Sequence, residues 1–228
     1  MQQAYRSLRI VSEAQTIRIV LANHPGELML KELSTACATL DTESSNGVKA
    51  VVLDFVQSAS AGSEGEAVSQ DVVDGAFAAV CGVAQPVLAV VRGTLSKVAC
   101  VLVRAADLTL VADDAVLTVP DAIDIASGGN DILTGVQAAR LGYVTWALPD
   151  QHVHKEMERI LDMLREKSAV ALRYTKASVR LGQADHVTQL EALDRVNTFY
   201  LTQVMPSADA HEGLSAFLEK RQPEWKNA

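Results

Sequence analysis

The sequence predicts an α/β fold that is followed by a helical C-terminal region. In the first half, short apolar runs rich in β-branched residues alternate with amphipathic stretches, an order typical of βαβ crossovers. After residue 128 only stretches of helical spacing follow, without internal repeats or low-complexity tracts. Because an α/β half followed by helices is one coherent architecture, residues 1–150 and 151–228 are expected to form one fold unit.

The N-terminal elements are predicted from alternation and from helical spacing. Ser7–Val11 and Thr16–Ala22 alternate apolar with polar residues and are expected to be strands, joined by a turn at Ser12–Gln15. His24-Pro25-Gly26 breaks the pattern. A helix is then expected from Glu27 to Leu40, where leucine and alanine recur near helical spacing.

The middle of the chain alternates strands with helices. Two nearly continuous β-branched runs, Lys49–Phe55 and Pro86–Val91, indicate strands that are buried on both faces, as in parallel sheets. The other expected elements are a small-residue loop at Ser58–Gly65, helices at Val68–Val83 and Leu95–Ala105, and strands at Leu108–Val111 and Ala115–Val119. The expected C-terminal helices are Asp131–Leu141, Val153–Glu166, Ala169–Leu181, His186–Met205 and Asp209–Lys220.

Composition excludes several classes of function. The 228 residues are 49% hydrophobic, enough for one large core, and the net charge of -8 disfavours binding to nucleic acid. No apolar run reaches the length that a membrane span needs. The N-terminal segment lacks the apolar stretch of a signal peptide, so a cytoplasmic location is expected, with no membrane partner.

The cysteines and histidines do not predict a metal site. Cys37, Cys81 and Cys100 lie among Ala, Val and Leu without regular spacing, which favours small buried hydrophobes over disulfides or metal ligands. His152 and His154 would share a face on a strand and could then bind a metal with a third ligand. No third ligand is evident nearby, and an exposed loop is the favoured interpretation.

Four stretches, in this order, resemble the crotonase (enoyl-CoA hydratase/isomerase) superfamily. They are VKAVVLDFVQSASAGSE, PVLAVVRGTLSKVACVLVRAADLTLVADDAVLTVPDA, TGVQAARLGYVTWALP and SADAHEGLSAFLEKRQPEW. The resemblance covers nearly the whole chain and implies the crotonase fold, a spiral of ββα units with a C-terminal helical region. The C-terminal stretch and the AVVRG turn look most like cyclic dienoyl-CoA hydratases of aromatic-acid breakdown.

The resemblance implies chemistry on an acyl-CoA thioester. Members of the family stabilise an enolate-like oxyanion with two backbone N–H groups, which map here to Ser63 and Val98. Of the two glutamates that hydratases use, the first falls at Val101 and the second at Asp121. Asp121 is therefore either the remaining acid/base or a turn or N-cap residue after Pro120.

Two departures from the family pattern concern this site. Lys97-Val98-Ala99 stands where the family has three glycines, which brings a β-branched side chain toward the thioester. Lys97 either meets a phosphate or carboxylate or extends outward to solvent. The segment Ala122–Leu133 is much shorter than its counterpart, which usually walls the acyl pocket, so the pocket is either open or covered by another segment.

Coenzyme A is expected as part of the substrate, with no tightly bound cofactor. The resemblance maps the adenine pocket to Ala61 and Ser63, and it maps two contacts with a neighbouring subunit's CoA to Phe217 and Lys220. Alternatively, Phe217 is a core residue of an amphipathic helix whose charges are solvated. The family implies a homotrimer or a dimer of trimers. Two hypotheses follow: a hydratase (lyase) or isomerase, or a catalytically impaired CoA-ester binder or oligomeric scaffold.

Overall fold

Two sheets form the centre of the molecule. The computed structural model describes residues 5–40, 47–57, 68–119, 132–182 and 189–227. The larger sheet has the order β1-β2-β3-β4-β6-β9, and the smaller one has the order β5-β7-β8. The strands are β1 (Arg9–Glu13), β2 (Thr16–Ala22), β3 (Ala50–Val56), β4 (Val87–Val91), β5 (Thr94–Leu95), β6 (Leu108–Ala112), β7 (Val116–Thr118), β8 (Ile132–Thr134) and β9 (Trp146–Leu148).

All neighbours in the larger sheet are parallel except β1 and β2. The carboxyl ends of β2, β3 and β4 therefore meet at one edge. All five residues of β4 are buried, and the first four of β3 are too, as the continuous apolar runs predicted. These strands form the core together with leucines of the helices.

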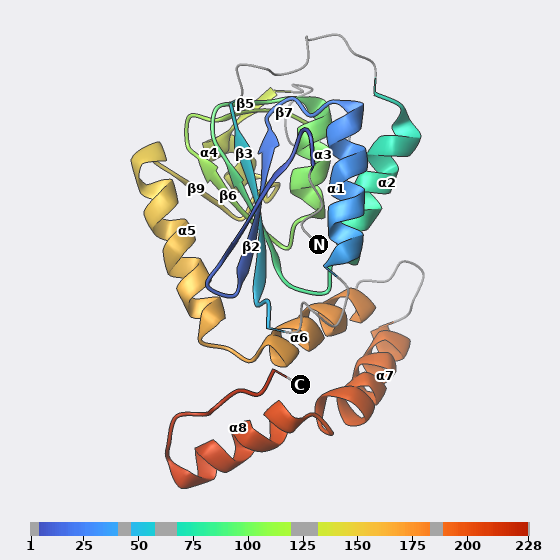
Figure 1. Ribbon diagram of the computed structural model, residues 1–228, viewed down its shortest axis with the longest axis vertical. Helices are drawn as coiled ribbons and strands as arrows, with labels where there is room; N and C mark the ends of the chain where they lie inside the picture. The colour runs from blue at the N-terminus through green and yellow to red at the C-terminus, as the bar shows by residue number, and fades with distance from the viewer. Residues whose placement is uncertain (1–4, 41–46, 58–67, 120–131, 183–188, 228) are drawn as a thin grey trace.

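Helices cover both faces of the larger sheet (Figure 1). They are α1 (Glu27–Thr39), α2 (Gln70–Gly82), α3 (Lys97–Ala105), α4 (Gly135–Arg140), α5 (Asp150–Arg165), α6 (Ala169–Gly182), α7 (Gln189–Phe199) and α8 (Ala208–Glu219). The helices α1, α2 and α3 pack together on one side, and α5 packs against β3 and β6 on the other. Beyond α6, the helices α7 and α8 lie away from the sheet.

The structure corrects several expected elements. The first strand is shifted to Arg9–Glu13, because Ala14 and Gln15 both adopt positive φ and form a two-residue hairpin turn. The expected helix at 131–141 begins only at Gly135, since Ile132–Thr134 pairs antiparallel with β7. The short strand β9 was not expected, and in the last part of the expected helix at 186–205 the residues Tyr200–Val204 are π-helical. None of the described helices is long and apolar enough to cross a membrane.

Glu32 in α1 binds the backbone of residues 6–8. Its carboxylate accepts hydrogen bonds from the N–H groups of Arg6, Ser7 and Leu8 at 2.8, 2.9 and 3.2 Å, and from Ser7 Oγ at 2.6 Å. Burial raises the pKa of Glu32, but these hydrogen bonds outweigh it and lower the pKa from its ordinary 4.5 to about 2. The ionised carboxylate is therefore the form that the folded chain prefers.

The Glu32→Gln variant is expected to lose about 1 kcal/mol of unfolding free energy at pH 7. Because the folded pKa lies below the unfolded one, the contribution of Glu32 is complete above pH 4.5 and is lost as the pH falls toward 2. Urea titrations at several pH values measure the difference between variant and wild type. Glu27→Gln, in an exposed pair with Lys31, is the control and should change stability little. A deficit that grows on acidification contradicts the prediction.

Candidate functional site

The first turn of α3 lies at the carboxyl edge of the larger sheet. Ser96 is the N-cap: its Oγ accepts the N–H of Ala99 at 3.3 Å, and its carbonyl accepts the N–H of Cys100 at 3.0 Å. The first N–H groups of a helix have no partner within the helix, and they carry the positive end of its dipole. Val98, the second residue of α3, presents such an N–H group. The structure therefore places this predicted donor at a helix start, which suits a developing negative charge.

The ends of β3, β4 and β5 lie near this helix start. Phe55 pairs with Val91 at the ends of β3 and β4, and Leu95 pairs with Leu117 of β7 immediately before α3. A Cβ atom at Gly93 would lie 3.5 Å from Gln57 Oε1, so the end of β3 touches the turn after β4. The expected helix at 95–105 begins two residues late because Thr94–Leu95 is this short strand. Gln57, the last described residue before Ser63, therefore lies beside the turn that leads to α3.

Three predicted site residues fall outside the described residues. Ala61 and Ser63 belong to 58–67, and Asp121 belongs to 120–131. Their roles stay predictions. Val119, the last described residue before Asp121, is buried at 2% exposure.

The side chains of α3 itself bring no acid to the site. Val98 and Val101 are partly buried and pack against the core, and Lys97 is exposed. The first turn of the helix holds no Asp or Glu. Any carboxylate at this site must therefore come from another segment.

Phe217 and Lys220 lie at the end of α8, on the surface. The Phe217 side chain is 79% exposed, next to Leu218 at 71%, so the interpretation of Phe217 as a core residue is wrong. Lys220 ends the helix with a left-handed φ of 55° and is exposed too. Large apolar side chains gathered on a surface are typical of contact with another molecule. Their predicted contact with a neighbouring subunit's CoA stays a prediction.

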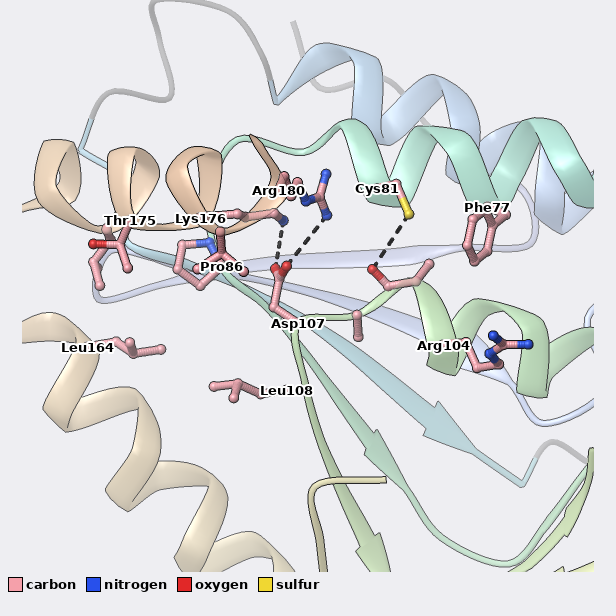
Figure 2. Close-up of a pocket in the computed structure, with 14 residues that line it drawn as sticks. Phe77, Cys81, Pro86, Arg104, Asp107, Leu108, Leu164, Thr175, Lys176 and Arg180 are labelled. Atoms are coloured by element: carbon pink, nitrogen blue, oxygen red, sulfur yellow. Dashed lines mark hydrogen bonds and ion pairs between the residues drawn. The ribbon is translucent and has the colours of Figure 1, made fainter. Parts of the chain in front are cut away.

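A separate pocket of about 870 Å³ lies between α2, α6 and the last turn of α3 (Figure 2). Its apolar lining includes Phe77, Pro86, Leu108 and Leu164. It reaches α3 at Arg104 and Ala105, about 10 Å along the helix from Val98 at 1.5 Å per residue. This pocket is therefore distinct from the helix start, and no sequence pattern indicated it.

An ion cluster forms the polar side of this pocket. Asp107 accepts a hydrogen bond from Lys176 Nζ at 2.6 Å, and Arg180 Nη2 lies 3.4 Å from its other carboxylate oxygen (Figure 2). Asp107 also accepts the N–H of Val87 at 2.8 Å. Lys176 also donates to the carbonyl of Gln85 at 2.9 Å. Burial lowers the pKa of Lys176, an effect that Asp107 opposes. The cluster ties α6 to the amino ends of β4 and β6.

The structure also places the histidines and cysteines that the sequence singled out. His152 and His154 lie in α5, where residues two apart point in different directions, so the expected loop is wrong and the strand geometry is absent. Among the described residues, no three His, Cys, Asp or Glu side chains are grouped as metal ligands would be. Cys37 and Cys100 are buried, which raises the pKa of each thiol to about 12 and confirms their expected role as hydrophobes.

Comparison with known proteins adds sequence and fold relatives. The Enoyl-CoA hydratase/isomerase family matches residues 122–228. Cyclohexa-1,5-dienecarbonyl-CoA hydratase from Thauera aromatica is 46% identical over 61 residues, which make up 26% of this chain and 22% of that enzyme.

Solved structures match over nearly the full length. An enoyl-CoA hydratase/isomerase from Mycobacterium paratuberculosis has a TM-score of 0.78 at 19% identity and covers 99% of this chain and 100% of its own. An enoyl-CoA hydratase/carnitine racemase from Magnetospirillum magneticum has a TM-score of 0.79 at 19% identity and covers 99% and 97%. At these identities the likeness establishes the fold.

Proposed function

We propose that the chain is a member of the crotonase superfamily that binds an acyl-CoA thioester and stabilises the enolate-like oxyanion formed at the thioester carbonyl. The match of residues 122–228 to the Enoyl-CoA hydratase/isomerase family and the crotonase fold of the chain support this proposal. The observation that carries this proposal is the start of α3. There a serine N-cap leaves the N–H of Val98 at a helix N-terminus, beside three strand ends. A preorganised donor of this kind stabilises charge that develops only in the transition state.

The second oxyanion donor in this proposal is the N–H of Ser63, and the acid/base is Asp121. Both assignments rest on the positions of these residues in stretches that resemble the family. One carboxylate suffices to move a proton between two carbons of an enolate, as an isomerase does. Hydration with Val101 in place of the first glutamate needs another base. The match to the Thauera aromatica hydratase supports cyclic dienoyl-CoA hydration as the specific reaction.

In this proposal coenzyme A is part of the substrate. Ala61 and Ser63 contact the adenine, and Phe217 and Lys220 of one subunit reach the CoA bound by its neighbour. The exposure of Phe217 and Leu218 supports a partner at this surface, since a lone chain leaves both in water. We therefore propose a homotrimer or a dimer of trimers. No tightly bound cofactor or metal is required.

A second candidate function is a CoA-ester binder or oligomeric scaffold without turnover. The observation that favours it is the apolar character of α3, where Val98 and Val101 replace a glycine and a glutamate of the family. Binding without catalysis needs the helix start and the adenine pocket but no acid/base. The two functions therefore differ in the role of Asp121.

Hydration of crotonyl-CoA and of cyclohexa-1,5-diene-1-carbonyl-CoA tests the proposed activity. The wild type should hydrate one of them, and Asp121→Asn should lower kcat by about 100-fold or more while binding of the thioester persists. Calorimetric titration with each thioester measures that binding. Equal turnover by wild type and Asp121→Asn removes Asp121 from the mechanism. Binding without hydration and without isomerisation of an enoyl-CoA double bond in the wild type selects the second function.

A further inference from the structure

Asn23 directly follows β2 and is 1% exposed. Its backbone N–H donates to the carbonyl of Val56 at 3.1 Å, which continues the pairing of β2 with β3. Its own carbonyl accepts the N–H of Ser96 at 3.1 Å. The backbone of Asn23 therefore holds the N-cap residue of α3 against the end of the sheet.

The Asn23 side chain binds the other end of the segment Arg92–Ser96, which leads from β4 to α3. Its Nδ2 donates to the carbonyl of Arg92 at 2.7 Å, and this contact fixes which end of the amide is nitrogen, since only the nitrogen can donate. Gly93 follows with a φ of +72°, and a Cβ there would lie 3.4 Å from Nδ2. The amide thus contacts the turn that leaves β4.

The connection held in this way runs from Arg92 to Ser96 and leads directly into α3. The Arg92 side chain is also engaged, at 3.2 Å from Asp150 and 3.6 Å from Asp54. Ser96 in turn caps the helix through Ala99 and Cys100. A shift at either end of the connection would move the cap and with it the first turn of α3.

We propose that Asn23 is the positioning residue of the oxyanion donor: by holding Arg92 and Ser96 together, it sets the direction of the Val98 N–H. This inference rests on the proposed function, which gives that N–H its oxyanion. Asn23 does not itself touch the reacting atoms, because its contacts with α3 pass through Ser96. Its Oδ1 is buried and meets no hydrogen-bond donor among the described residues.

Because the Asn23 Oδ1 accepts no hydrogen bond from the described residues, Asn23→Leu is an informative variant. Leucine keeps the branched shape of the side chain, removes the Nδ2 donor and also removes the unpaired acceptor, so losses and gains in stability oppose each other. A residue that serves only stability would then leave the site unchanged. If Asn23 positions the donor, the first turn of α3 loosens, and kcat falls by about 10- to 100-fold while KM changes little. Asn23→Ala, which opens space, repeats the test if the leucine variant does not fold.

Thr16→Val is the matched control. Thr16 begins the same strand at its opposite end, is 4% exposed, and its Oγ1 likewise meets no donor among the described residues. The variant alters a buried, unpaired polar group on β2 without touching α3. Its kcat and its helix protection should match those of the wild type.

Amide hydrogen exchange of Ala99 and Cys100, whose N–H groups bond to Ser96, measures the cap without any substrate. Faster exchange in Asn23→Leu but not in Thr16→Val, with the fall in kcat at constant KM, supports the inference. Unchanged exchange overturns it, whatever the turnover. If the wild type converts no CoA thioester, the proposed function is wrong. The exchange rates of these two amides still test separately whether Asn23 positions the start of α3.

Discussion

Replacing Gly135 by alanine is expected to destabilise the protein by about 3 kcal/mol, because the site has no room for a Cβ atom. That atom would lie 2.0 Å from the carbonyl oxygen of Ala112 and 3.2 Å from Cα of Asp113, and both are backbone. The helix start cannot simply retreat, since the N–H of Gly135 donates to the carbonyl of Ala115 at 2.8 Å. Denaturant titration of the variant measures the loss.

Gly75→Ala is the control for this prediction. Gly75 is exposed in the interior of α2, and a Cβ there meets no atom of the described residues within 4 Å. Alanine should stabilise the helix by about 0.5–1 kcal/mol, because it restricts the unfolded chain more than glycine does. The two substitutions are chemically identical and should have opposite signs. A stability loss at both positions, or at neither, would contradict the steric argument.

Asp107→Asn is expected to cost about 2–3 kcal/mol, since it leaves the Lys176 ammonium buried without its counter-charge. Lys176 is 6% exposed in its side chain and Asp107 is 27% exposed, so solvent screens the pair only in part. Adding Lys176→Met to Asp107→Asn should recover most of the loss, because no charge then stays buried. Urea unfolding of the two single variants and the double variant measures the coupling.

The same cluster has a defined pH dependence. Burial lowers the folded pKa of Lys176 below its ordinary 10.5, so the unfolded chain binds more protons between the two values. Because Asp107 raises the pKa of Lys176, its removal lowers that pKa further, and the buried ammonium of Asp107→Asn loses its proton at a lower pH than in the wild type. The deficit of Asp107→Asn should therefore shrink as the pH rises toward 10.5. Arg180→Ala, at 3.4 Å from Asp107 and more exposed, should cost less than about 1 kcal/mol. An equal loss in Arg180→Ala and Asp107→Asn would falsify the special role of Lys176.

The strands that the sequence predicted best are those whose pattern is local. The run at Pro86–Val91 is apolar throughout, and β4 is buried throughout, because parallel central strands are covered on both faces. Short edge elements were missed. Ile132–Thr134 and Trp146–Leu148 are three residues long, too short for periodicity, and pairing with distant strands decides their conformation.

The residues of the candidate site also differ in whether a local sequence pattern could predict them. Val98 could be assigned from its position in a motif, and the structure places it at a helix start. Ser96 as the N-cap was overlooked, although a serine before an apolar helical run is a recognised start signal. Asn23 carried no such signal, because its partners Arg92 and Ser96 are far away along the chain.

By itself, the sequence determined the α/β order, the C-terminal helices and the resemblance to the crotonase superfamily, because periodicity and motif spacing are local properties of the chain. Only the tertiary structure decided that Phe217 is exposed, that Gly135 admits no side chain, and that Asn23 holds the start of α3. Each of these depends on which distant segments meet, and burial, steric exclusion and hydrogen bonding exist only once they do.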